Sequence, residues 1–178
     1  MRRRQQVGAL LAAAMVGGCG GSTGGPSTPS AAHVTGGGIT LSAPSGWSVR
    51  TLPDDGGLVF TAARRDLFAV APAGARLVAT PAGVPFAVAA ANALQAGQHE
   101  SHGAAHTRKT VIDARRSVVI DWAVGAGDAR RRTRVVVVDL GTGRVVRLEM
   151  ESPQREWSGA VQALGTMISG ADFADARR

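Results

Sequence analysis

Three segments in the second half of the chain have the character of β-strands and are joined by short glycine-containing turns, which restricts the fold more than any other feature. Val146, Leu148 and Met150 alternate with charged residues, so the last segment has one apolar and one polar face. Residues 135–138 are all valine, which is typical of a central strand covered on both faces. The pattern predicts an antiparallel meander over residues 117–124, 132–140 and 144–151.

Shorter strand candidates precede the meander. Ile39 and Leu41 alternate with polar residues, as do Trp47 and Val49, and the turn at residues 43–46 separates the two pairs. We expect further short strands at residues 58–61, 67–71 and 76–80.

Two helices are expected. Residues 85–98 place small apolar residues at three- and four-residue spacing after Pro85, which suits close packing on a sheet. A second helix is expected to be capped by Ser152, with Pro153 at its first position, and to end at Gly170. Its apolar stripe consists of Trp157, Ala160, Val161, Leu164, Met167 and Ile168. The strands and helices together predict one α+β domain over residues 37–173, with Phe173 at its last edge.

The N-terminus predicts export. Three arginines at residues 2–4 precede an apolar run, residues 7–18, that is too short to cross a hydrocarbon core of about 30 Å. Residues 16–19 resemble the lipobox of bacterial lipoproteins, which implies cleavage before Cys19 and a diacylglyceryl thioether on its sulfur, with further acylation such as palmitate. An ordinary secretory signal is the alternative. The residues after the arginines match the twin-arginine motif poorly, so we expect the general secretory route.

These features predict the organisation of the chain. Residues 1–18 are the signal peptide, residues 19–36 are the lipidated cysteine and a flexible Gly/Ser/Pro linker, and residues 174–178 are a charged tail. Two or more acyl chains give stable attachment, so the domain is expected on the extracytoplasmic side of the cell membrane. Removal of the leader lowers the formal charge from +7 to +4, and no basic stripe is interleaved with aromatic residues, which argues against a nucleic-acid partner.

The layout resembles actinobacterial lipoproteins of the LpqN type. The resemblance rests on the lipobox, the polar linker, the turn at Pro44, Gly46 and Trp47, the meander, and a terminal helix with an early Trp157. It implies the PsbP-like fold, named after a photosystem II subunit: an antiparallel sheet flanked by helices on both faces, an α/β/α sandwich. It transfers no catalytic residues and no cofactor, and it implies a binding or accessory protein.

Three histidines fall within eight residues. If the first helix continued, His99, His102 and His106 would share one face and could bind Zn²⁺ through imidazole nitrogens. The spacing lacks the glutamate of the zincin motif, and Gly103 weakens the helix that would align the three side chains. A solvated loop after the helix is the alternative.

The densest basic cluster consists of Arg130, Arg131, Arg132 and Arg134, with Arg115 and Arg116 expected near it if the first two strands of the meander pair. Such a cluster can bind phospholipid headgroups or another anionic envelope polymer. The alternative is a solvated hairpin end whose arginine stems cover apolar surface.

No nucleotide-binding loop occurs in the sequence, and its Gly-x-Ser-x-Gly pattern at residues 20–24 lies in the predicted linker and not in a strand-to-helix nucleophile elbow, so we expect no enzyme. The sequence predicts a membrane-anchored envelope lipoprotein that binds or scaffolds an envelope protein or anionic lipid. One alternative is a carrier that encloses an apolar ligand near Trp47, Trp122 or Trp157. The other is a metal-binding or hydrolytic protein that uses the histidines at 99–106.

Overall fold

The computed structural model describes residues 32–36, 39–44, 47–51, 57–62 and 76–173. The predicted signal peptide, Cys19, the linker up to residue 31, the strand expected at residues 67–71 and the charged tail lie outside the described residues.

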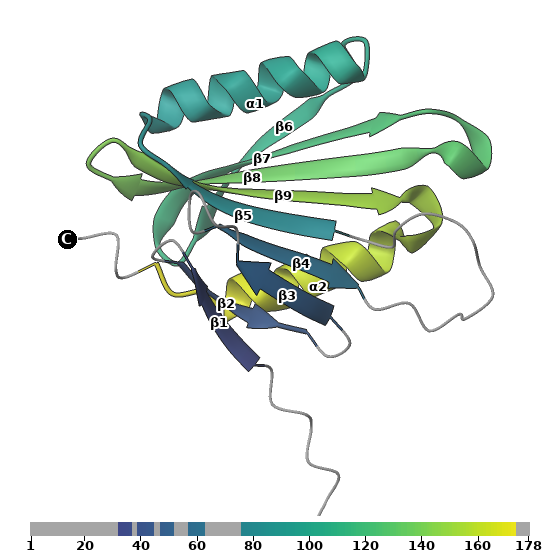
Figure 1. Cartoon of the computed structure of the whole chain (residues 1–178). Helices are drawn as coiled ribbons and strands as arrows, with labels where there is room; N and C mark the ends of the chain where they lie inside the picture. The colour runs from purple at the N-terminus through teal and green to yellow at the C-terminus, as the bar shows by residue number, and fades with distance from the viewer. Residues whose placement is uncertain (1–31, 37–38, 45–46, 52–56, 63–75, 174–178) are drawn as a thin grey trace, which may run out of the picture.

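Antiparallel pairing organises the main sheet, as the sequence predicted (Figure 1). Within the described residues the sheet has seven strands, and each neighbouring pair is antiparallel. Their spatial order is β3 (Trp47–Thr51), β4 (Leu58–Ala62), β5 (Arg76–Ala82), β9 (Arg144–Pro153), β8 (Arg131–Gly141), β7 (Arg115–Val124) and β6 (His106–Ile112).

The predicted meander is confirmed as β7, β8 and β9. Ser117 pairs with Val138 and Val124 with Arg131, so β7 and β8 form a long hairpin. Gly141 and Gly143 have φ of 77° and 73° in the turn between β8 and β9, a left-handed backbone that glycine adopts without steric cost. These two glycines therefore allow the sharp reversal that brings β9 alongside β8.

Two core clusters lie on opposite sides of the central strands, because successive side chains of a strand point to opposite faces. Val135 and Val137 pack in one cluster with Ala93 of α1 (Phe86–Glu100). Val136 and Val138 belong to the other, which includes four side chains of α2 (Trp157–Ser169). In the view of Figure 1, α1 lies above the sheet and α2 below it.

Close packing fixes the C-terminal half of α1 to β7. Gly97 lies against the indole of Trp122, and a Cβ added at this glycine would be 2.8 Å from Trp122 Cε3. The indole Nε1–H donates a hydrogen bond of 2.8 Å to Glu100 at the helix end. The small side chains of α1 thus allow the close approach that the sequence predicted.

The α2 side is completed by a separate two-stranded sheet. Strands β1 (Ala32–Gly36) and β2 (Ile39–Ala43) pair with each other, and Ile39 and Leu41 are fully buried in the cluster that contains α2. Phe173 is also fully buried there, in agreement with its predicted place at the last edge.

Three elements differ from the sequence-based expectations. Strand β1 occupies the end of the predicted linker, because Val34 packs against the α2-side core. Ser152 does not cap the second helix: it is buried in β9, its hydroxyl donates to the carbonyl of Pro153, and the 3₁₀ turn η2 (Gln154–Glu156) precedes α2. Strand β6 was not predicted, because an exposed edge strand needs no apolar alternation.

The contact between Gly97 and Trp122 yields a stability prediction. Alanine favours a helix over glycine by about 1 kcal/mol, but at position 97 the new methyl group must displace the indole, which costs about 1–3 kcal/mol. We therefore expect Gly97→Ala to lower the free energy of unfolding, measured by urea denaturation. Gly165→Ala is the control, because nothing lies within 4 Å of a Cβ there; it should stabilise the protein. Equal effects of the two substitutions would contradict the packing described.

Candidate functional site

Strand register divides the predicted arginine cluster into separate sets. Arg131 is paired with Glu151 through its Nε, on the face of the sheet occupied by Val135 and Val137. Arg132 and Arg134 point to the other face, where both guanidinium groups lie over the ring of Trp157 at the start of α2. The four arginines therefore do not form one continuous basic surface.

Arg134 is neutralised by a bidentate ion pair. Its Nε donates to Asp121 Oδ1 at 2.6 Å and its Nη2 to Oδ2 at 2.9 Å, because Asp121 and Arg134 are direct partners in the β7–β8 ladder. The two side chains are only 20% and 14% exposed. Partial burial reduces the screening of this pair by solvent, so it is expected to contribute more than a surface ion pair.

Arg132 is held differently. Its guanidinium carbon lies 4.5 Å from the centroid of the Trp157 ring, a cation–π geometry that leaves the N–H groups available for other acceptors. Arg130 is exposed and follows the 3₁₀ turn η1 (Gly127–Ala129). Within the part of the chain that the structure describes, neither Arg130 nor Arg132 forms an ion pair with a carboxylate.

These two arginines line a hollow at the end of the sheet where β7 ends and β8 begins. The hollow has a volume of about 360 Å³, and we call it the basic hollow. Apart from two alanines, its lining residues are His106, Asp121, Trp122, Arg130, Arg132 and Gln154. The N–H of Gln154 donates to the carbonyl of Arg130 at 2.9 Å, which ties η2 to the start of β8.

The three predicted zinc ligands lie in different elements. Helix α1 ends at Glu100, so His99 is exposed in its last turn, whereas His102 has a φ of 52° in the following turn. His106 begins β6 and lines the basic hollow. The shared helical face on which the zinc prediction depended does not form. Within the described ranges, no three His, Cys, Asp or Glu side chains are grouped to hold a metal ion.

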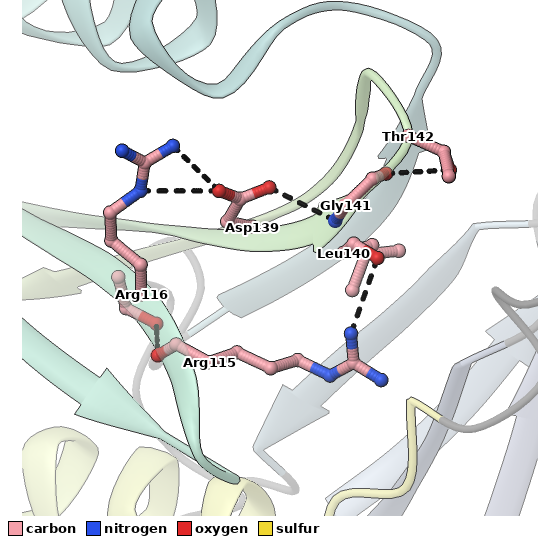
Figure 2. A network of polar contacts seen from close by, with 7 residues as sticks. Arg115, Arg116, Asp139, Leu140, Gly141 and Thr142 are labelled. Carbon is pink, nitrogen blue, oxygen red and sulfur yellow. Dashed lines mark hydrogen bonds and ion pairs between the residues drawn. The ribbon is translucent and has the colours of Figure 1, made fainter.

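Arg115 and Arg116 lie at the opposite end of the sheet from the basic hollow, so the expectation that they join Arg130 is wrong. Arg115 donates to the carbonyls of Leu140 and Phe173, which fixes the C-terminal segment to the sheet. Figure 2 shows this end, with Arg116 reaching towards Asp139. Arg116 also lies 4.4 Å from the centroid of the Phe86 ring.

Asp139 is the anionic centre of this second end. Its Oδ2 accepts hydrogen bonds from Arg116, and its Oδ1 accepts one of 3.0 Å from the N–H of Gly141. Partial burial raises the pKa of the Asp139 carboxyl, but the Gly141 hydrogen bond and the Arg116 guanidinium lower it by more, so its pKa lies below the ordinary value. The network stabilises the β8–β9 turn, and all its charged groups are partnered.

One hollow of about 380 Å³ is lined by α1 residues alone, among them Asn92, His99 and Glu100. Among the described residues, two further hollows, lined mainly by apolar side chains, lie between α1 and the sheet. One of about 240 Å³ is lined by Phe86, Ala90 and Val118 with Lys109 and Arg116, and the other, of about 280 Å³, lies beside Ala93 and Val145. Both are smaller than the usual range of ligand pockets, about 300–1,000 Å³. Neither is lined by a tryptophan, although the predicted carrier would place its ligand near one.

No known family model matches the chain, and no curated protein matches it. Solved structures do match. Cyanobacterial PsbP from Synechocystis sp. PCC 6803 is 16% identical with a TM-score of 0.53, over 88% of this chain and 98% of that one. The chain has the fold of this protein.

Two further solved structures share the fold. LpqN of Mycobacterium tuberculosis, described as involved in cell envelope biogenesis, is 12% identical with a TM-score of 0.55, over 84% of this chain and 86% of that one. The Ran-binding protein Mog1p of Saccharomyces cerevisiae is 15% identical with a TM-score of 0.53, over 82% and 97%. The predicted likeness to PsbP and LpqN is thus confirmed for the fold. Among the described residues, neither helix is long and apolar enough to span a membrane.

The two ion pairs predict different coupling energies. Arg116 is 68% exposed, so its coupling with Asp139 should be below about 1 kcal/mol, whereas the Arg134–Asp121 pair should reach about 1.5–3 kcal/mol. Double-mutant cycles with alanine at each position, measured by urea denaturation, give both values. A coupling for Arg134 and Asp121 no larger than that for the exposed pair would contradict the assignment.

The lowered pKa of Asp139 predicts acid sensitivity. A carboxyl whose pKa is lower in the folded than in the unfolded protein stabilises the fold above the unfolded pKa, about 4, and this stabilisation is lost as pH falls through the folded pKa. The difference in unfolding free energy between wild type and Asp139→Asn should therefore shrink as pH falls from about 6 to 2. A difference that does not change with pH would show that the Asp139 charge contributes nothing.

Proposed function

We propose that the chain is a lipoprotein anchored to the cell membrane on its extracytoplasmic side, whose PsbP-like α/β/α domain binds or scaffolds another envelope component without catalysing a reaction. The observation that carries the proposal is the combination of a lipobox-like sequence ending at Cys19 with a domain of the LpqN fold. LpqN is described as involved in cell envelope biogenesis, and Mog1p as Ran-binding, so the fold occurs in proteins with envelope and binding roles.

The proposed mechanism is display close to the membrane. Acyl chains on Cys19 hold the protein, and residues 20–31, rich in Gly, Ser, Thr and Pro, connect the anchor to β1. Twelve residues of such composition give a root-mean-square reach of roughly 20 Å. This tether keeps the domain near membrane-bound partners and raises its effective concentration for them.

The basic hollow supplies a binding surface for an anionic partner. Arg130 and Arg132 lie on the exposed end of the sheet, and their charges are not balanced by carboxylates of the described domain. The proposed partners of these two arginines are anionic lipid headgroups and acidic groups of envelope proteins.

The anchor is tested at Cys19 itself. We expect mass spectrometry of the mature protein from membranes of the producing cell to find an N-terminal peptide that begins at Cys19 and carries a diacylglyceryl group. Cys19→Ala should move the protein from the membrane to the soluble fraction, because the thioether can no longer form. Ser22→Ala, a control just beyond the cleavage site, should stay in the membrane. An N-terminal peptide that still begins at Met1, or a mature Cys19 with a free thiol, would refute the anchor.

A further inference from the structure

The basic hollow carries positive charge that no carboxylate of the described residues balances. The only carboxylate in its lining, Asp121, accepts hydrogen bonds from Nε and Nη2 of Arg134, which lies outside the lining of the hollow. Arg130 and Arg132 therefore keep their full charge towards the hollow. The basic hollow thus attracts an anion.

The fold holds the side chain of Arg132 and the backbone of Arg130 in place before any ligand binds. Trp157 stacks beneath the guanidinium of Arg132, and the hydrogen bond from Gln154 N–H fixes the backbone of Arg130. A side chain that is held before binding loses less conformational entropy when its ligand arrives. Arg132 therefore differs from a freely solvated surface arginine.

The donors around the basic hollow match a phosphate group better than a carboxylate. Each guanidinium offers several N–H donors in a planar fork, and the Gln154 amide and the His106 imidazole can add more from η2 and β6. A phosphate presents three or more oxygens in a tetrahedral arrangement and can accept from several sides, whereas a carboxylate presents two oxygens in one plane.

We propose that the basic hollow binds the phosphate group of a phosphorylated ligand through Arg130 and Arg132, with His106 and Gln154 as further donors. The group can belong to a phospholipid head or to a free phosphate ester. This inference rests on the binding role proposed above but not on lipidation of Cys19. The experiments can therefore refute phosphate binding without refuting the lipid anchor, and the reverse.

Isothermal titration calorimetry of the full chain, made non-lipidated by Cys19→Ala, tests the site. Inorganic phosphate and glycerol 3-phosphate should bind saturably at constant ionic strength, and acetate should bind at least tenfold more weakly. Arg130→Gln and Arg132→Gln should each weaken phosphate binding about tenfold, the loss of one charge-assisted contact. Arg50→Gln, which removes the same charge from exposed β3 at the far end of the strand order, should change it less than about twofold.

Vesicle flotation distinguishes the two sources of phosphate. If phosphatidylglycerol vesicles, but not phosphatidylcholine vesicles, carry the protein and inorganic phosphate releases it, the ligand is an anionic lipid head. If glycerol 3-phosphate binds and neither vesicle does, the ligand is a soluble phosphate ester. Both results support the site.

Three results would overturn the proposal: no saturable binding of phosphate or glycerol 3-phosphate, equal binding of acetate, or an equal loss of affinity in Arg50→Gln. Arg132 also packs on Trp157, so its substitution can destabilise the fold. A loss of affinity in Arg132→Gln is therefore attributed to the site only if this variant unfolds at the same urea concentration as wild type. Arg130 is exposed, and its variant keeps the test decisive if Arg132→Gln is unstable.

Discussion

Strand β8 pairs with β7 on one side and β9 on the other, and its four consecutive valines are buried on both faces of the sheet. A strand in this position has a strongly specified register, because a slip of one residue would exchange every side chain between the two cores. The same register fixes the polar end of β8: it places Arg134 opposite Asp121 and directs Arg132 to Trp157. Packing of the apolar centre thus determines which cations are neutralised and which face the basic hollow.

The two ends of the sheet use arginine in different ways. At the β8–β9 turn, Arg115 and Arg116 are partnered by backbone carbonyls and by Asp139, so their charge serves the fold (Figure 2). At the other end, the described carboxylates satisfy Arg131 and Arg134 but leave Arg130 and Arg132 facing the basic hollow. This difference supports the binding role proposed for one end, whereas the contacts at the other end are structural.

Patterns of neighbouring residues predicted the elements whose formation depends on residues close together in the sequence. The meander followed from β-strand character and turn glycines, and the helix at Trp157 from its apolar stripe. The pairing of β5 with β9 could not be predicted, because it joins segments more than sixty residues apart along the chain and depends on the whole sheet. The predicted helix cap at Ser152 was wrong, because the same sequence, Ser followed by Pro, also fits the end of a strand followed by a 3₁₀ turn. The arginine cluster was visible in the sequence. Which of its arginines form ion pairs could not be predicted, because that depends on the register of β7 against β8. The positions of Gln154 and His106 beside the hollow depend on the tertiary fold.

The central claim is that register and packing leave a phosphate-binding hollow at one end of the sheet. Backbone amide NMR spectra of the full chain with and without inorganic phosphate locate any binding directly. The account predicts saturable chemical-shift changes concentrated at His106, Arg130 and Gln154, with the resonances of Arg116 and Gly141 at the opposite end unchanged. Changes spread over all basic residues, or confined to the Arg116 end, would contradict it.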